Sequence, residues 1–387
     1  MALNTVSSDR LSTNVKNTNF TAAEKQDLTD DILPLAGQLG NRNLIINGAM
    51  QVAQRGTSFA DPANGTFTLD RFSMRNSSGT PAFTFSQDSD APHGFNNSLK
   101  VACTTADASP AAGSISRITY KTEAQDLQPL AKGTSSAKAS TLSFYVKTNK
   151  TGLYTVFVYD DDNNRMFSAS YTVSDTNWNR YTINIPADTT GTINDDNGIG
   201  FVINFGLSLG SNRTSGSLAS TWATYVTANE HVGNVNFADN TSNVWAITGV
   251  QLEVGSVATE FEHRSFAQEL ALCHRYFLKF DPSGTDSYCF AGKGAGTTGV
   301  DFNFILPRPL RASPTVALED GGGGNLRATR GTSGVSTSNN TPTVQGFNSN
   351  VNMLCLRQTG HSSMSDGVVS MASLSSSGVF ITFSSEL

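Results

Sequence analysis

Two aromatic side chains in a polar part of the sequence have the chemistry to bind a sugar. Trp222 and Tyr225 follow the polar run 215–221, which lies between two stretches of strand-like sequence. An aromatic ring at a surface offers a flat apolar face to the C–H groups of a sugar ring. We therefore predict that Trp222 and Tyr225 contact a glycan. Packing of Trp222 against a neighbouring loop or subunit is the alternative.

Two groups of acidic residues could bind a cation or cleave a glycosidic bond. Asp160, Asp161 and Asp162 fall within one turn, and Asp195 and Asp196 form a pair. Carboxylate oxygens suit Ca²⁺, but the spacing lacks the distal Glu of an EF-hand loop. A solvated turn at 160–162 is the interpretation we favour, and bound Ca²⁺ there stays open. A glycosidase needs two carboxylates that face one bond, and nothing in the sequence positions these residues in that way.

The remaining sequence signals of catalysis or metal binding are missing. No GxSxG, HExxH or Walker motif occurs, and the four cysteines are too widely separated to form a CxxC pair. We therefore predict a protein that is not an enzyme, with no catalytic, cofactor-binding or metal-binding residues. The cysteines are expected to be free, buried thiols.

The composition points to a polar surface with little charge. Of the 387 residues only 15% are charged, the net charge is −6, and about a third of the residues are Ser, Thr or Asn. Apolar runs are too short to span a membrane, no signal peptide is recognised, and no basic patch suggests a nucleic-acid partner. We predict neither membrane insertion nor nucleic-acid binding. Ser, Thr, Asn and Gly favour turns and strand surfaces, so an all-β protein is expected.

Residues 41–262 show the period-two alternation of half-buried strands. In 142–147, for example, Leu142, Phe144 and Val146 share one face. About eleven short strands joined by polar turns predict a jelly-roll β-sandwich. The predicted strands are 43–47, 70–75, 82–87, 98–104, 114–122, 141–147, 152–159, 165–173, 180–185, 198–209 and 244–254.

Two helices are expected outside this sandwich. Thr21 and Glu24 have the spacing of a capping box, and a narrow apolar stripe follows over a helix at about 21–35. Ser265 and Gln268 repeat the capping-box spacing and start a second helix at about 265–279. Further strand patterns follow at 287–291, 300–306, 315–318, 353–358, 368–374 and 379–383, interrupted by a loop-like excursion at 332–343.

The sequence therefore predicts an all-β protein of four parts. Residues 1–40 form an N-terminal attachment segment with a short helical anchor, and 41–262 form the jelly-roll β-sandwich. Residues 263–280 form a linker helix, and 281–387 form a smaller C-terminal β-sandwich at the distal tip.

Several stretches, within roughly 41–318, resemble bacteriophage tail-fibre and related virion-fibre proteins. The stretches that carry this resemblance are NRNLIINGAM at 41–50, QRG at 54–56, DRF at 70–72, WAITGVQLEVG at 245–255, ATEFE at 258–262, ELALCHRYF at 269–277 and RPLRASPTV at 308–316. The sandwich also resembles the jelly roll of carbohydrate-binding modules, through TLSFYVK at 141–147 and WNRY at 178–181.

This resemblance implies a phage tail fibre that binds a receptor for host adhesion. Such a protein is a homotrimer, attaches to other tail or virion proteins through residues 1–40, and binds bacterial surface glycans through its β domains. It would be located in the virion, after assembly in the cytoplasm of the host bacterium. Two alternatives stay open: a capsid- or neck-attached fibre or decoration protein without receptor binding, and a polysaccharide depolymerase acting through Asp160 or Asp196.

Overall fold

The computed structural model describes residues 41–77, 81–281, 288–320, 326–329, 335–338, 340–346, 352–362, 364, 369–374 and 379–387. The predicted attachment segment 1–40 and its helix at 21–35 lie outside these residues. The strands and helices of the described residues lie in the unit Leu44–Leu387.

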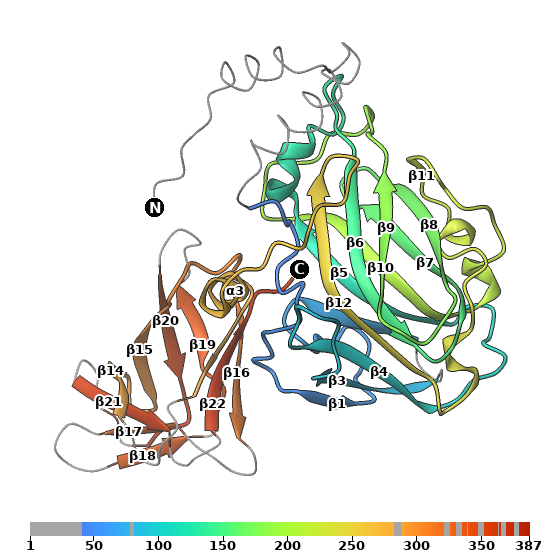
Figure 1. Cartoon of the computed structure of the whole chain (residues 1–387). Coiled ribbons are helices and arrows are strands. Elements are labelled where there is room, and N and C mark those ends of the chain that lie inside the picture. The colour runs from blue at the N-terminus through green and yellow to red at the C-terminus, as the bar shows by residue number, and fades with distance from the viewer. Residues whose placement is uncertain are drawn as a thin grey trace, which may run out of the picture. The chain divides into compact units, whose positions relative to one another are not determined.

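Two six-stranded antiparallel sheets form a β-sandwich (Figure 1). The first sheet has the order β1 (Ser58–Ala60), β3 (Ala82–Asp88), β4 (Ser98–Thr105), β12 (Val244–Val254), β6 (Ser140–Thr148) and β9 (Asn179–Ile185). The second sheet has the order β11 (Ala223–Thr224), β8 (Arg165–Val173), β7 (Gly152–Asp160), β10 (Ile199–Leu209), β5 (Ile115–Glu123) and β2 (Phe72–Asn76). The sandwich predicted for 41–262 is present, with strand bounds that follow the alternation of the sequence.

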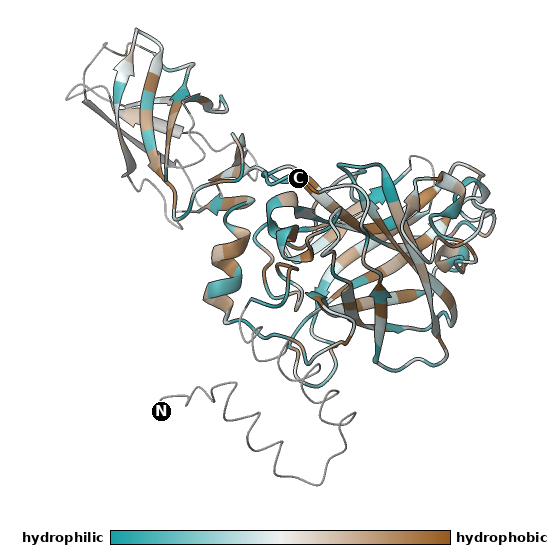
Figure 2. Cartoon of the chain, turned by 90° about the horizontal axis from the view of Figure 1, so that it is seen from above, coloured by the Kyte–Doolittle hydropathy of each residue, from teal (hydrophilic) through white to brown (hydrophobic). Residues whose placement is uncertain are grey.

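Alternation along the strands separates an apolar inner face from a polar outer face. On β10, Phe201, Ile203 and Phe205 are fully buried in the core between the sheets, while Asn204 points the other way. Figure 2 shows the same banding of hydrophobic and hydrophilic residues along the strands. Trp245 on β12 also lies in this core.

The connections of the sandwich contain several short 3₁₀ helices. η1 (Ala124–Leu130) follows β5, whereas η2 (Ser211–Arg213), η3 (Thr227–Asn229) and η4 (Phe237–Asp239) lie in the long connection from β10 to β12. This connection also contributes the short edge strand β11.

The C-terminal part consists of two smaller antiparallel sheets. One has the order β13 (Phe277–Phe280), β22 (Val379–Ser384) and β16 (Thr315–Asp320). The other has the order β18 (Val335–Ser338), β17 (Leu326–Thr329), β21 (Val369–Leu374), β14 (Tyr288–Ala295), β15 (Gly299–Ile305), β20 (Met353–Gln358) and β19 (Thr343–Gly346). Both sheets contribute to one apolar cluster, which contains Phe302, Leu356 and Phe383.

The helix predicted at 265–279 is shorter than expected. Helix α3 (Phe266–Cys273) begins at Ser265, whose side chain accepts a hydrogen bond from the Gln268 backbone in a complete capping box. The helix ends at Cys273, and Phe277–Phe280 form strand β13 instead, because their backbone pairs with β22. The extension of the helix to residue 279 was therefore wrong.

Two further predictions need correction. The strand expected at 43–47 is absent, because Asn47 and Met50 adopt left-handed backbone angles (φ 61° and 56°) that turn the chain. The excursion at 332–343 is not only a loop, since it contains β18. Trp178 is half-buried at the surface, where its Nε1 donates to Asp90.

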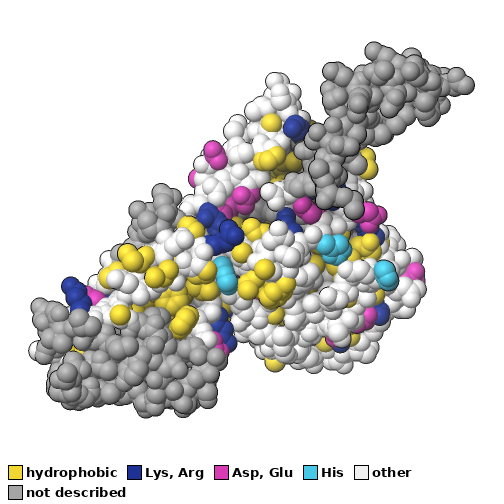
Figure 3. Space-filling view, turned by 60° about the vertical axis from the view of Figure 1, so that its left-hand side comes forward, with side chains coloured by type: hydrophobic (Ala, Val, Ile, Leu, Met, Phe, Trp, Pro, Cys, Tyr) yellow, Lys and Arg dark blue, Asp and Glu magenta, His cyan; other side chains and the backbone are white. Residues whose placement is uncertain are grey.

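The scarcity of charge is visible on the molecular surface. The face drawn in Figure 3 is mostly uncharged, with scattered Lys, Arg, Asp and Glu side chains. Two of the cysteines, Cys103 and Cys273, are buried free thiols, and Cys355 is free and half-buried. No helix among the described residues is long and apolar enough to cross a membrane.

A buried ion pair joins the residues after β22 to the sandwich. Arg71, only 1% exposed, donates to the Glu386 carboxylate and to the Lys121 backbone oxygen (2.6 Å). Its guanidinium carbon lies 3.4 Å from the centre of the Tyr276 ring. Arg55 binds the other Glu386 oxygen at 3.1 Å. The carboxylate is therefore out of water and depends on these two guanidinium groups.

Replacing Arg71 by an apolar side chain should strongly destabilise the protein. In Arg71→Met, Glu386 stays buried with half of its compensation removed, and we expect a loss of about 3–5 kcal/mol of unfolding free energy. Urea unfolding followed by tryptophan fluorescence measures it. The double variant R71M/E386L should recover part of this loss, and a single variant within about 0.5 kcal/mol of the wild type would show that the pair is not important for stability.

Candidate functional site

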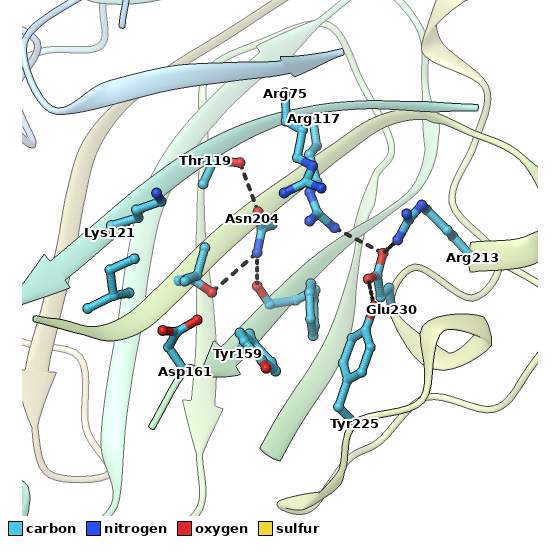
Figure 4. A pocket seen from close by; sticks show the side chains of 13 residues that line it. Arg75, Arg117, Thr119, Lys121, Tyr159, Asp161, Asn204, Arg213, Tyr225 and Glu230 are labelled. Atoms are coloured by element: carbon cyan, nitrogen blue, oxygen red, sulfur yellow. Dashed lines mark hydrogen bonds and ion pairs between the residues drawn. The ribbon is translucent and has the colours of Figure 1, made fainter. Parts of the chain in front are cut away.

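The outer face of the second sheet carries a pocket of about 320 Å³. We call it the outer-face pocket (Figure 4). Its volume lies at the lower end of the range of small-molecule sites, about 300–1,000 Å³. Strands β2, β5, β7 and β10, the turn after β7 and the connection after β10 supply its lining, which consists of Arg75, Arg117, Thr119, Lys121, Phe157, Tyr159, Asp161, Ile199, Val202, Asn204, Arg213, Tyr225 and Glu230.

Neighbouring strands hold the floor of the pocket rigidly. Arg117, Thr119 and Lys121 point outward from β5, since they alternate with the core residues Ile118 and Tyr120. Thr119 lies opposite Asn204 of β10, and its hydroxyl donates to Asn204 Oδ1 at 2.8 Å.

The amide of Asn204 is fixed on its other side as well. Its Nδ2 donates to the backbone oxygens of Phe157 (3.3 Å) and Val202 (3.2 Å). Because Asn204 is fully buried and its amide has these partners, the floor of the pocket is preorganised.

One wall of the pocket depends on the carboxylate of Glu230, which is 1% exposed. Its Oε2 accepts hydrogen bonds from Arg117 Nη1 (2.9 Å) and Arg213 Nη1 (2.6 Å), and its Oε1 accepts one from the Tyr225 hydroxyl (2.6 Å). These contacts tie the connection after β10 to strand β5. They also place two guanidinium groups on one carboxylate, so the cluster carries a net positive charge.

Burial and nearby charges shift the pKa of Arg117 in this cluster. Burial lowers the pKa of Arg117 to about 10; Arg75 and Arg213 also lower it, whereas Glu230 raises it. A pKa near 10 leaves Arg117 charged at neutral pH. Arg75 lies directly opposite Arg117 across the β2–β5 pair, which explains its repulsive contribution.

A neutral histidine lies beneath the wall. His231 is fully buried, and burial together with the charges of Arg117 and Arg213 lowers its pKa well below the usual value. The Thr155 hydroxyl donates to Asn234 Oδ1 (2.8 Å), so His231 Nδ1, also 2.8 Å from that hydroxyl, carries the proton of the neutral ring.

The opposite end of the pocket contains Lys121, Asp161 and Tyr159. Lys121 donates to the backbone oxygen of Leu387 at 2.7 Å. Burial and the neighbouring Asp162 raise the pKa of Asp161, while the charge of Lys121 lowers it. The half-exposed Tyr159 ring packs edge-on against Tyr225, with 5.3 Å between ring centres.

The structure places the two predicted glycan-binding residues in different sites. Tyr225 lines the outer-face pocket, although its hydroxyl is used by Glu230. Trp222 packs against Phe201 (5.3 Å between ring centres), and its Nε1 donates to Pro186 at 2.9 Å. The cavity beside Trp222 measures only about 10 Å³. A glycan contact by either residue stays a prediction.

In the acidic turn at 160–162, Asp161 and Asp162 are exposed, in line with a solvated turn, whereas Asp160 is not. Asp160 is fully buried and binds Lys132 Nζ at 2.5 Å, and it also accepts hydrogen bonds from Asn163. The positive charge of Lys132 therefore balances the negative charge of Asp160. Asp196, proposed with it as a catalytic candidate, accepts a hydrogen bond from the Gly198 backbone at 2.8 Å.

Within the described ranges, no group of three or more His, Cys, Asp or Glu side chains could hold a metal ion.

Most of the lining residues were not predicted from the sequence. The alternation of Arg117, Thr119 and Lys121 on one strand was a usable signal, because it places three polar side chains on one outer face. Arg75, Arg213 and Glu230 gave no such signal, since they come from distant parts of the chain.

Comparisons with known proteins found no match among family models and none among curated proteins. Among solved structures, the chain is similar to a family 11 carbohydrate-binding module of Clostridium thermocellum in complex with a β-1,3-1,4-mixed-linked tetrasaccharide. The identity is 13%, the TM-score is 0.28, and the match covers 52% of this chain and 98% of that one.

Two other similar structures are a tandem pair of family 22 carbohydrate-binding modules and a phage protein. The tandem pair, from Xyn10C of Paenibacillus barcinonensis, is 10% identical with a TM-score of 0.28, over 89% of this chain and 98% of that one. The enzymatically active domain of bacteriophage CBA120 tailspike protein 4 is 14% identical with a TM-score of 0.29, over 55% of this chain and 21% of that one. All three structures are only distantly similar to this chain.

The neutral His231 should make stability depend on pH. The unfolded chain binds a proton at this histidine below about pH 6.5, whereas the folded protein resists protonation there. Acidification through pH 6.5 should therefore lower the unfolding temperature. His231→Asn should show a smaller decrease than the wild type between about pH 7 and 5, as measured by differential scanning calorimetry.

The exposed His93 supplies the control for this prediction. His93→Asn should keep the wild-type pH dependence, because this side chain lies in solvent. An unchanged pH dependence in His231→Asn would contradict a buried, neutral His231.

Proposed function

We propose that this chain binds a saccharide in the outer-face pocket. The observation that carries the proposal is the half-exposed Tyr159 ring beside charged and neutral hydrogen-bonding groups, all held on paired strands. A sugar has an apolar C–H face and a rim of hydroxyl groups. The pocket offers a matching ring face and a matching set of donors and acceptors.

The polar groups around Tyr159 suit hydroxyl recognition. Lys121 and Arg75 are donors, and Asp161 accepts hydrogen bonds when ionised. The floor at Thr119 and Asn204 is already fixed by hydrogen bonds, so little conformational entropy is lost when a ligand binds.

Binding rather than hydrolysis is the chemistry that we propose. Glu230 is held by two guanidinium groups, which leaves Asp161 as the remaining carboxylate of the pocket lining. Asp160 is buried and forms an ion pair with Lys132, so it is not available either. A glycosidase of the usual kind needs two available carboxylates.

We further propose that the chain is a virion fibre that recognises a bacterial surface. The resemblance of residues 41–50 and 245–255 to virion-fibre proteins supports this role. The fibre would be a homotrimer, attached to other virion proteins through residues 1–40. Three weak sites on one fibre would then strengthen attachment by avidity. A mass measurement in solution tests the trimer, and imaging of labelled virions tests the location.

Replacing Tyr159 by alanine should weaken glycan binding. We expect Tyr159→Ala to lose about tenfold or more in affinity for an immobilised bacterial polysaccharide that binds the wild type, which corresponds to about 1.4 kcal/mol. Surface plasmon resonance on a panel of capsular and cell-wall polysaccharides measures this.

Trp178→Ala is the matched control, because it removes a half-buried aromatic ring at the surface beside the first sheet. It should bind like the wild type. Equal affinities of Tyr159→Ala and the wild type would reject the outer-face pocket as the binding site, and a wild type that binds no polysaccharide of the panel would reject the proposed function.

A further inference from the structure

The charges of the outer-face pocket are unevenly distributed. At the end nearest β2, the lining contains three guanidinium groups (Arg75, Arg117 and Arg213) and one carboxylate, Glu230, which pairs with Arg117 and Arg213. The whole chain carries a net charge of −6, so this concentration of positive charge is local. It needs an explanation, because like charges in close proximity destabilise a folded protein.

Arg75 is the accessible member of this group. It is exposed on β2, and its register partner across the strand pair is Arg117. Within the described residues, neither a hydrogen bond nor an ion pair of the Arg75 guanidinium occurs. Its five N–H donors are therefore available to a ligand.

The buried Arg117 and the partly buried Arg213 behind Arg75 are not fully compensated. Arg117 and Arg213 share a single oxygen of Glu230, and the Nε atom of each is buried without a hydrogen-bond partner among the described residues. The second oxygen of Glu230 is used by Tyr225. About one positive charge thus stays unbalanced behind the positive charge of Arg75.

The far end of the pocket differs in its electrostatics. Lys121 is partly buried, is bound to the Leu387 backbone oxygen, and lies close enough to Asp161 to lower the pKa of that carboxyl. The two side chains offset each other there. A ligand would therefore meet a positive end at Arg75 and a nearly neutral end at Lys121 and Asp161, where the Tyr159 ring lies beside Asp161 (Figure 4).

We propose that the saccharide bound in this pocket is acidic, and that its negative group binds the Arg75 guanidinium in front of the Arg117–Arg213–Glu230 cluster. This inference rests on the proposed function and adds the class of ligand. The acidic group is a carboxylate, as in a uronic acid, or a phosphate ester. A planar guanidinium binds either with two parallel hydrogen bonds.

Binding of such a ligand would offset the repulsion between Arg75 and Arg117. An anion bound to Arg75 would also lie near its register partner Arg117. It would add the negative charge that the Arg117–Arg213–Glu230 cluster lacks. The interaction is partly exposed, so it weakens as ionic strength rises.

The test compares acidic and neutralised forms of the same polysaccharides. The full chain is measured by surface plasmon resonance against polygalacturonate, hyaluronan, uronate-containing capsular polysaccharides, glycerol-phosphate teichoic acid, dextran and neutral O-antigen chains. Each acidic polysaccharide that binds is then measured again after reduction of its carboxyl groups or removal of its phosphates. We expect binding to the acidic members alone, a loss of at least tenfold on neutralisation, and weaker binding at higher salt.

Three variants assign the effect to Arg75. Arg75→Gln should lose at least tenfold in affinity, and Arg75→Lys should lose less because it keeps the charge. Lys293→Gln on β14 removes the same charge outside the pocket and should bind like the wild type. Without ligand, Arg75→Gln should unfold at a temperature no lower than the wild type, because the repulsion with Arg117 is relieved.

The outcomes separate the two proposals. Binding of a neutral polysaccharide, binding that survives neutralisation, or unchanged affinity in Arg75→Gln would overturn the acidic-ligand inference and leave saccharide binding intact. Failure of every polysaccharide to bind would overturn the proposed function and this inference together. Binding to the carboxylate or to the phosphate members identifies the source of the negative charge.

Discussion

The Glu230 carboxylate is the interaction on which the candidate site depends. It lies in the long connection after β10, and it binds Arg117 of the sheet, Arg213 and Tyr225. Moving a charged group from water into the protein interior is costly unless an opposite charge compensates it. The paired carboxylate therefore holds the connection in one position against the sheet. Burial, together with the charges of Arg117 and Arg213, lowers the pKa of the neighbouring His231 and keeps it neutral. The same cluster leaves positive charge at one end of the pocket.

The low charge content of the chain has a structural counterpart. Several of its few charged residues are buried and paired rather than exposed: Arg71 with Glu386, Lys132 with Asp160, and Arg117 with Glu230. Each pair joins segments that are far apart in the sequence. Uncharged Thr and Asn side chains also join distant segments, as in the Thr119–Asn204 hydrogen bond of the pocket floor. Buried polar contacts of this kind favour one arrangement of the loops over others.

Much of the fold could be predicted because strand periodicity is a local property. The bounds expected for β8, β12 and β20 agree with the structure residue for residue, and most other strands differ by one or two positions. The errors lie where tertiary contacts override local preference. The apolar stripe at 266–277 suits a helix, yet its last residues pair with β22, which is distant in sequence. The short strand β18 lies in a run of Ser, Thr and Asn that resembles a loop.

Local patterns along the chain were enough to predict the all-β class and the sandwich, because alternation along a strand sets which face each side chain occupies. Which polar residues meet became clear from the folded molecule alone. Arg117 and Glu230 are 113 residues apart, and their contact follows from the path of the connection after β10. The same path brings Tyr225 into the pocket and turns Trp222 against the core. Side chains so distant along the chain share no local signal, so their meeting depends on how the sheets and connections pack.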